Sequence, residues 1–248
     1  MRWSGIAAGL GLLLLGAAHS QAAVLYATGF ENPPFVLGPI NGQAGWSVFS
    51  ASSQTSDPVI ESSLVKTGLQ AVRVDGSVTG QTGPIYTPNF VDPQLDLSAD
   101  IYIASSSIES EWQFATTGAG GIGFAGGIDV VGTSLVGITD SYPVIGSLSR
   151  DAWHHVDIIL NYTSQTYSVD LDGSTVAANL AFCGNNFGTC NGAAVDSMGW
   201  TLFDSFGHGN DLGAMDNFSI ATVPEPATLA LLATGLLGLG LRRPRRRQ

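Results

Sequence analysis

Between residues 24 and 223 no stretch of the sequence keeps a helical period of hydrophobic residues, and this restricts the fold more than any other feature. Short runs of alternating hydrophobic and polar residues recur instead, separated by turn signals. The clearest run places five hydrophobic residues on one face of a strand: Leu95, Leu97, Ala99, Ile101 and Ile103. This pattern predicts an all-β sandwich of antiparallel sheets. The glycine-rich stretch 118–132 favours an edge or a loop within it.

Residues 153–178 predict three consecutive antiparallel strands. The first covers 153–160 and the second 165–171, and Asp172-Gly173 then turns the chain into the third, because Asp-Gly accommodates positive φ at low cost. The segment WHHVDIILNYTSQTYSVDLDG resembles a Trp-His strand and the following strand of laminin-G-like and concanavalin A-like proteins. The resemblance implies a jelly-roll β-sandwich.

The two ends of this domain carry a second resemblance. Phe30-Glu31 leads to Gly45-Trp46, and the final predicted strand, 215–220, contains Asp216-Asn217. Many jelly-roll carbohydrate-binding modules open and close in a similar way, and in those relatives the first Glu and the last Asp often share a structural calcium. The resemblance therefore implies a calcium site at Glu31 and Asp216. The alternative is that both acids lie at the surface and accept hydrogen bonds from local backbone.

The N-terminal segment has the features of a secretory signal peptide. Arg2 precedes an apolar stretch from Ile6 to Ala18 and a small-residue segment, with cleavage expected after Ala22 or Ala23. We therefore expect a signal peptide at 1–22, a jelly-roll domain at 23–222 and a separate tail at 223–248.

The tail begins with Pro224-Glu225-Pro226 and continues with fifteen mostly apolar residues, 227–241. The prolines delay any helix until after Pro226, and fifteen helical residues span about 22 Å, less than a hydrocarbon core of about 30 Å. A cluster of five arginines follows and places that end in the cytoplasm: Arg242, Arg243, Arg245, Arg246 and Arg247. These features predict a marginal membrane anchor, and the alternative is an ordinary C-terminal helix of a soluble domain.

This tail resembles the PEP-CTERM sorting signal of Gram-negative bacteria that make extracellular polysaccharide. The resemblance implies an exosortase-type processing enzyme as a partner, a transient stay in the inner membrane, and a final place at the cell surface or in the extracellular matrix.

The charge of the predicted domain excludes one class of partner. Residues 24–223 contain three basic residues and nineteen acidic ones, a formal charge of −16. Nucleic acid is not expected as a partner, because phosphate binding needs a basic face. Such acidity favours solubility and divalent-ion binding, although exported proteins are often acidic for no other reason.

The only two cysteines, Cys183 and Cys190, lie in one short loop. A close pair in an exported chain predicts a disulfide, whose ring of about eight residues would stabilise the domain by about 2–3 kcal/mol. A redox-active pair would more often have the spacing Cys-x-x-Cys.

Other candidates for chemistry are weaker. Glu109 and Glu111 would face the same side of a strand and so suggest a glycosidase pair, but the alternative is an exposed turn rising into a strand. Four tryptophans would stack on sugars if they were exposed: Trp46, Trp112, Trp153 and Trp200. A core position is commoner for tryptophan in a sandwich, and we expect Trp153 in the core. The histidines do not form a metal motif: His154, His155 and His208.

Together these features predict an exported, non-enzymatic protein of the cell surface or extracellular matrix, either structural or associated with glycan. The alternative is a polysaccharide-active enzyme, a glycoside hydrolase or lyase, on the same fold. Two close carboxylates in a groove would favour hydrolysis, and an exposed tryptophan platform without such a pair would favour binding.

Overall fold

The computed structural model describes residues 22–50, 57–76, 81–88, 90–119, 123–183, 195–206 and 211–224. Residues 23–223 form one compact unit. The predicted signal peptide at 1–22, apart from its last residue, and the predicted apolar helix at 227–241 lie outside the described residues. In the part of the chain that is described, no helix is both long and apolar enough to cross a membrane.

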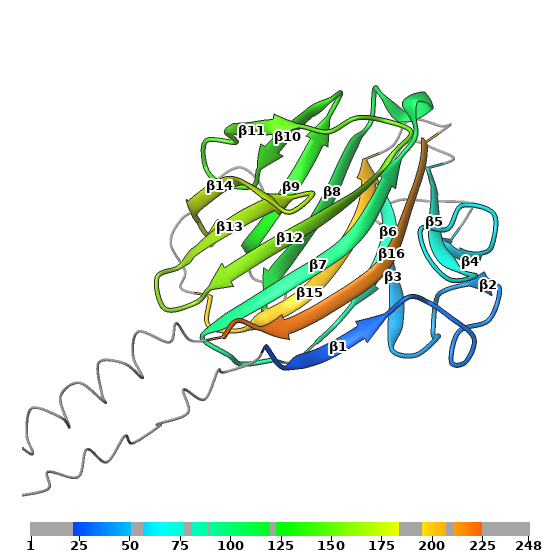
Figure 1. Ribbon diagram of the computed structural model, residues 1–248, viewed down its shortest axis with the longest axis horizontal. Coiled ribbons are helices and arrows are strands. Elements are labelled where there is room, and N and C mark those ends of the chain that lie inside the picture. The colour runs from blue at the N-terminus through cyan, green and yellow to red at the C-terminus, as the bar shows by residue number, and fades with distance from the viewer. Residues whose placement is uncertain are drawn as a thin grey trace, which may run out of the picture. The chain divides into compact units, whose positions relative to one another are not determined.

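The domain is an all-β sandwich of two antiparallel sheets, as predicted (Figure 1). The larger sheet has nine strands, and β1 (Val24–Thr28) pairs with β16 beside the main path. Its other strands follow in spatial order: β14 (Ser174–Ala181), β13 (Thr166–Leu171), β12 (Trp153–Asn161), β7 (Gln94–Ile103), β16 (Asp211–Thr222), β5 (Ala71–Gly76), β4 (Val59–Glu61) and β2 (Gly38–Pro39).

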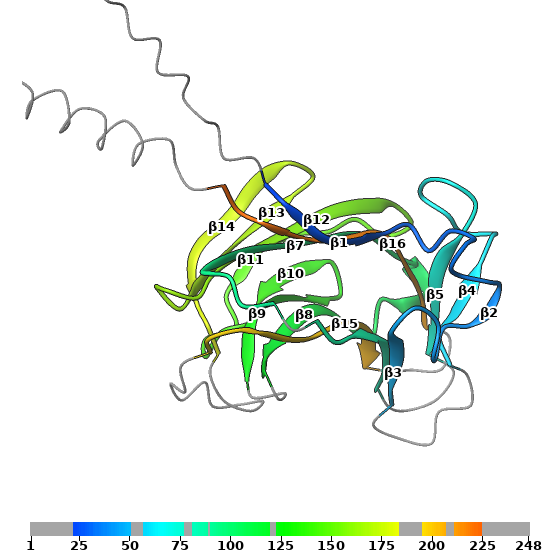
Figure 2. The same cartoon turned by 90° about the horizontal axis from the view of Figure 1, so that it is seen from below.

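The smaller sheet has seven strands and forms the second layer, which lies below the larger sheet in Figure 2. Its spatial order is β11 (Val144–Ser147), β10 (Ser134–Gly137), β9 (Phe124–Val131), β8 (Glu111–Gly118), β15 (Met198–Phe206), β6 (Gln81–Tyr86) and β3 (Trp46–Ser50). A short 3₁₀ helix, Ser105–Ser107, follows β7.

The alternating run in β7 shows how the sequence builds the core. Its five hydrophobic residues are all buried, as predicted: Leu95, Leu97, Ala99, Ile101 and Ile103. Aromatic side chains fill the space between the sheets, and Trp112 of β8 stacks on Phe203 of β15 with ring centroids 5.3 Å apart. Gly213 of β16 faces this pair, where a Cβ atom would lie 2.3 Å from Trp112 Cζ3. The larger sheet therefore needs a glycine at this point to admit the indole.

The predicted hairpins at 153–178 are confirmed. β12 pairs with β13 from Val156 to Asn161, and β13 pairs with β14 across the Asp172-Gly173 turn. Both turn residues have positive φ, 51° for Asp172 and 75° for Gly173, which is the conformation that this dipeptide accommodates.

Two interpretations of the sequence were wrong. Trp153 is only half-buried, because it lies on the outward-facing side of β12 together with His155. Its ring packs against Tyr102 with centroids 5.7 Å apart. The larger part of the glycine-rich stretch, 124–131, is neither an edge nor a loop but the strand β9, which lies between β8 and β10. Residues 120–122 of the stretch lie outside the described residues. A Cβ atom on Gly127 would lie 2.4 Å from that of Ala115, so close packing rather than freedom explains the glycine.

Candidate functional site

A row of polar side chains crosses the outer face of the smaller sheet. Asp204 of β15 is the cross-strand neighbour of Gln113 on β8, which in turn neighbours Asp129 on β9. Gln113 Nε2 donates to Asp129 Oδ1 at 2.9 Å, and Gln81 Nε2 of β6 donates to Asp204 Oδ2. Strand pairing thus aligns four residues that are far apart in the sequence.

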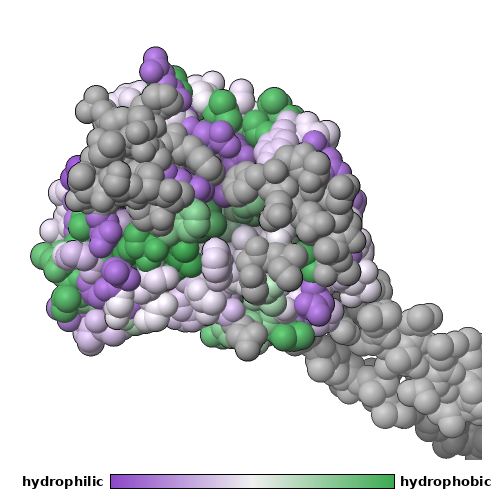
Figure 3. All heavy atoms as spheres, turned by 180° about the vertical axis from the view of Figure 1, so that it is seen from behind, coloured by the Kyte–Doolittle hydropathy of each residue, from purple (hydrophilic) through white to green (hydrophobic). Residues whose placement is uncertain are grey.

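One end of this row opens into a pocket of about 520 Å³. Two carboxylates line the pocket together with mainly apolar walls: Glu111, Asp129, Val131, Ser134, Val136, Tyr142 and Val144. Tyr142 has an exposed fraction of 37% and Val144 one of 68%, so part of the wall faces solvent. Figure 3 shows this side of the domain from behind, where hydrophilic and hydrophobic residues meet.

Burial controls the protonation of these acids. The pKa of Asp129 rises to about 7, chiefly because burial disfavours the charged form, while the hydrogen bond from Gln113 lowers it. Glu111 raises it further through its charge and through a hydrogen bond with Asp129. Complete burial likewise raises the pKa of Asp204 well above its usual range. Near neutral pH, Asp129 is therefore partly protonated, and Asp204 keeps its proton to a higher pH than an exposed aspartate does.

The arrangement does not match the glycosidase pair suggested by the sequence. Glu109 is exposed and precedes β8, which begins at Glu111, so the two residues do not share a strand face. Glu111 instead meets Asp129, which the sequence pattern did not indicate because Asp129 lies in the glycine-rich stretch. Carboxyl groups in hydrogen-bond contact are closer than the roughly 5–9.5 Å that retaining and inverting glycosidases require.

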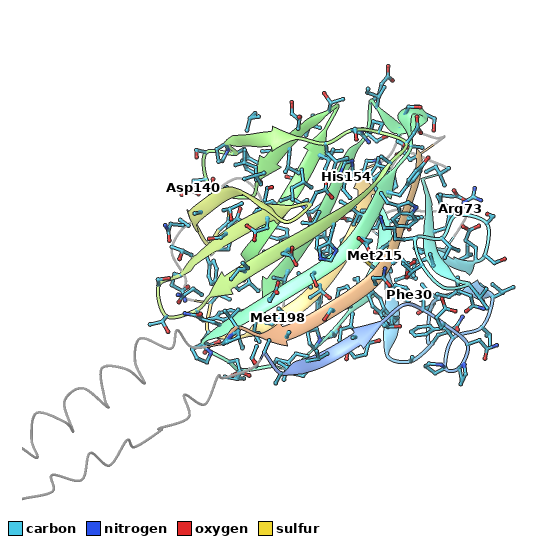
Figure 4. All side chains as sticks on the ribbon, viewed as in Figure 1. Phe30, Arg73, Asp140, His154, Met198 and Met215 are labelled. Atoms are coloured by element: carbon cyan, nitrogen blue, oxygen red, sulfur yellow. The ribbon has the colours of Figure 1, made fainter. Side chains whose placement is uncertain are left out.

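Glu31 and Asp216 meet the same loop, as expected from neighbouring first and last strands, since β1 pairs with β16. Asp216 Oδ2 accepts the backbone N–H groups of Lys66 and Thr67 at 3.1 and 3.0 Å, and its Oδ1 accepts that of Asn217 at 2.7 Å. Figure 4 labels Phe30 and Met215, the neighbours of these two acids in the sequence.

Glu31 completes the contact with the loop between β4 and β5. Its Oε1 accepts the backbone N–H groups of Leu69 and Gln70 at 2.7 and 3.1 Å. Glu31, near the start of the domain, and Asp216, near its end, therefore both bind the loop between β4 and β5. Asp216 is completely buried, unlike the surface acid of the alternative interpretation.

The arrangement of Glu31 and Asp216 suits a calcium ion only in part. Calcium takes oxygen ligands, whereas the loop presents N–H donors to both carboxylates. Oxygen atoms gather near Gly29, where an added Cβ atom would lie 3.6 Å from both Asp216 Oδ1 and Asn217 Oδ1. Within the described ranges, no group of three or more His, Cys, Asp or Glu side chains suits a metal ion.

The remaining candidates divide between core and surface. Trp46 and Trp112 are buried, and Trp200 of β15 has an exposed fraction of 38%. His154 contacts Asp172 at 2.7 Å, and His155 contacts Asp100 and Asp157 at 3.1 and 3.2 Å. His208 lies outside the described residues.

Cys183 is buried, and the described part of the chain contains no free cysteine. Cys190 lies outside the described residues, so its disulfide with Cys183 stays a prediction. We expect thiol counting on the unfolded, unreduced protein to find no free thiol and, after reduction, to find two. Two free thiols before reduction would contradict the disulfide.

Residues 222–247 match the PEP-CTERM protein-sorting motif, which confirms the resemblance seen in the tail. Pro224 is the last described residue of this segment, and the other residues of the predicted motif and membrane stop lie outside the described ranges: Glu225, Pro226, Arg242, Arg243, Arg245, Arg246 and Arg247. No curated protein matches the chain.

Solved structures with the same fold include three informative examples. A cellulose induced protein, Cip1, is 15% identical, with a TM-score of 0.58, over 80% of this chain and 97% of its own. The carbohydrate recognition domain of Emp47p is 7% identical, with a TM-score of 0.51, over 79% of this chain and 95% of its own. A sialidase is 11% identical, with a TM-score of 0.52, over 72% of this chain, and the match spans only 17% of the sialidase. These similarities support a concanavalin-like domain.

Proposed function

We propose that the chain is an exported, non-enzymatic protein of the Gram-negative cell surface or extracellular matrix, whose domain binds glycan. Its parts are a signal peptide at 1–22, a jelly-roll domain at 23–222 and a sorting tail at 223–248. The tail anchors the chain transiently in the inner membrane until an exosortase-type enzyme processes it. The matched sorting motif supports this route.

The observation that carries the binding proposal is the pocket at the end of the polar row. Sugar sites combine apolar surface with a few fixed polar groups, and here Tyr142 and three valines accompany Glu111 and Asp129. Gln113 fixes Asp129 through a 2.9 Å hydrogen bond. The carbohydrate recognition domain of Emp47p, which has the same fold, adds support by analogy.

A glycan array with the 23–223 domain tests the binding proposal. We expect binding to at least one class of polysaccharide, weakened when Tyr142→Ala removes part of the pocket wall. Leu69→Ala is a matched control, because Leu69 is also exposed but lies on the loop beside Glu31. Absence of any bound glycan, or equal loss in both variants, would contradict the proposal.

A polysaccharide-active enzyme is the second candidate, favoured by the Asp129 carboxyl, whose pKa of about 7 suits a general acid near neutral pH. Release of new reducing or unsaturated ends from a bound polysaccharide, lost in Asp129→Asn, would establish it. Binding without such release supports the non-enzymatic function.

The sorting tail yields a prediction on the mature protein. We expect the intact mass of the protein recovered from the surface of its host to lack residues 229–248, because cleavage follows the Pro-Glu-Pro segment. A variant with Ala in place of Pro224, Glu225 and Pro226 should keep the full tail and stay with the inner membrane. A surface protein that still carries residues 229–248 would contradict the proposed processing of the tail.

We propose further that calcium joins the first strand to the last through Glu31 and Asp216, with Asn217 Oδ1 nearby. A ligand that binds only the folded state stabilises it by about 2.7 kcal/mol at a hundredfold excess over Kd. Millimolar calcium should therefore raise the melting temperature of the chelator-treated domain by about 5–10 °C, and magnesium should do less. An unchanged melting temperature would contradict the calcium site. Both acids would then serve only as acceptors of backbone N–H groups.

A further inference from the structure

The pocket at the end of the polar row holds negative charge that none of its lining residues balances. Glu111 and Asp129 contact each other there, and the lining contains no Lys, Arg or His. Two of the three basic residues of the described domain are engaged elsewhere: Arg73 pairs with Asp75 at 2.8 Å, and Arg150 Nε donates to the Gly132 carbonyl oxygen at 2.8 Å.

The polar row beside the pocket contains two buried oxygen atoms without a hydrogen-bond partner in the described part of the chain. Gln113 is 1% exposed, and its Oε1 is buried without a hydrogen-bond partner in the described part of the chain. The same holds for Oδ1 of Asp204, which is completely buried. Both side chains are buried and neither lines the pocket, so a ligand reaches the carboxylates of Glu111 and Asp129 alone. It is the negative charge of these carboxylates that favours a ligand with N–H donors and positive charge.

The shape of the pocket favours an organic cation over a metal ion. About 520 Å³ is far more than one ion occupies, and valine and tyrosine walls offer no strong ligand to a metal. The same walls suit the C–H face of a sugar ring. An ammonium group supplies three donors and one positive charge to the carboxylates.

We propose that this pocket binds the free amino group of an amino sugar, so that the glycan recognised by the domain is a deacetylated aminoglycan. The proposal rests on the proposed glycan-binding function and specifies its ligand. The ammonium group lies against Glu111 and Asp129, and the ring lies against Tyr142 and the valines. An N-acetylated sugar lacks the charge and two of the three donors.

Calorimetry with the 23–223 domain tests the ligand class, with glucosamine oligomers, the same oligomers fully N-acetylated, and lysine oligomers of equal charge. We expect the free-amine oligomers to bind at least about tenfold more tightly than the acetylated ones, because a charged hydrogen bond contributes about 1.5–3 kcal/mol. Asp129→Asn and Glu111→Gln should each remove most of that preference.

The matched control is Asp57→Asn, which removes the same charge at an exposed acid just before β4 in the other sheet. It should change the affinity less than about twofold, since isolated exposed charges contribute little. Equal loss in Asp57→Asn and Asp129→Asn would overturn the proposal in favour of general attraction to a polycation. Melting curves confirm that each variant is folded.

The remaining outcomes separate this inference from the proposed function. Equal or tighter binding of the acetylated oligomers overturns the amino-sugar ligand and leaves glycan binding intact. Lysine oligomers that bind as tightly as the amino sugars also overturn it and indicate a peptide ligand. If neither these oligomers nor any glycan on the array binds, the proposed function fails as well.

Discussion

The Asp129→Asn domain is expected to keep more of its stability than the wild type when the pH is raised from 4 to 7. The pKa of Asp129 rises from 3.8 to about 7 on folding, so in this range the folded state binds a proton that the unfolded state releases. The free energy of unfolding therefore falls as pH rises, by about 4 kcal/mol at most for a change of about three pKa units.

Asparagine resembles the protonated acid: it can accept from Gln113 and donate to Glu111 without carrying charge. Urea unfolding of the wild-type and Asp129→Asn domains at several pH values measures the difference. The wild type should lose more stability than the variant as pH rises. Asp96 and Asp204 contribute to the slope of both proteins, because burial raises the pKa of Asp96 to about 6 and that of Asp204 well above its usual range. Identical slopes would show that Asp129 ionises normally. Asp57→Asn again provides the control.

Replacing Asp216 with alanine is expected to destabilise the domain by about 3 kcal/mol or more. The change leaves three partly buried backbone N–H groups without their acceptor, those of Lys66, Thr67 and Asn217, and each such loss costs about 1 kcal/mol, the low end of the range for a fully buried group. It also releases the loop between β4 and β5 from the last strand.

Urea unfolding in the presence of a chelator measures this loss separately from any calcium effect. Asp216→Asn should lose less than the alanine variant, because its amide oxygen still accepts one or two of the N–H groups. A loss below about 1 kcal/mol for Asp216→Ala would show that water replaces the carboxylate at low cost.

Local patterns predicted the strands, since periodicity and turn chemistry act over a few residues. The run in β7 buried the predicted face, and Asp172-Gly173 turned the chain as expected. Trp153 was placed in the core from its strand context, but it has the outward phase of His155 and Asp157.

The candidate site could not be predicted in the same way. Glu111 and Asp129 are eighteen positions apart and meet only because β8 pairs with β9. The sequence contains no signal for that register, and Gly126-Gly127 before Asp129 suggested a loop. In fact these glycines let the strand pack, since a Cβ atom on Gly126 would lie 2.7 Å from Leu160.

The place of β16 in the sheet determines how the domain responds to mechanical load. This strand ends at Thr222, the first residue of the matched sorting motif. It nevertheless lies inside the larger sheet between β7 and β5, with β1 also paired to it. A pull on the C-terminal end of the domain therefore acts along β16 and must shear many backbone hydrogen bonds at once. An edge strand under the same pull would peel away one bond at a time. A protein held by its C-terminal end would thus keep its fold under tension.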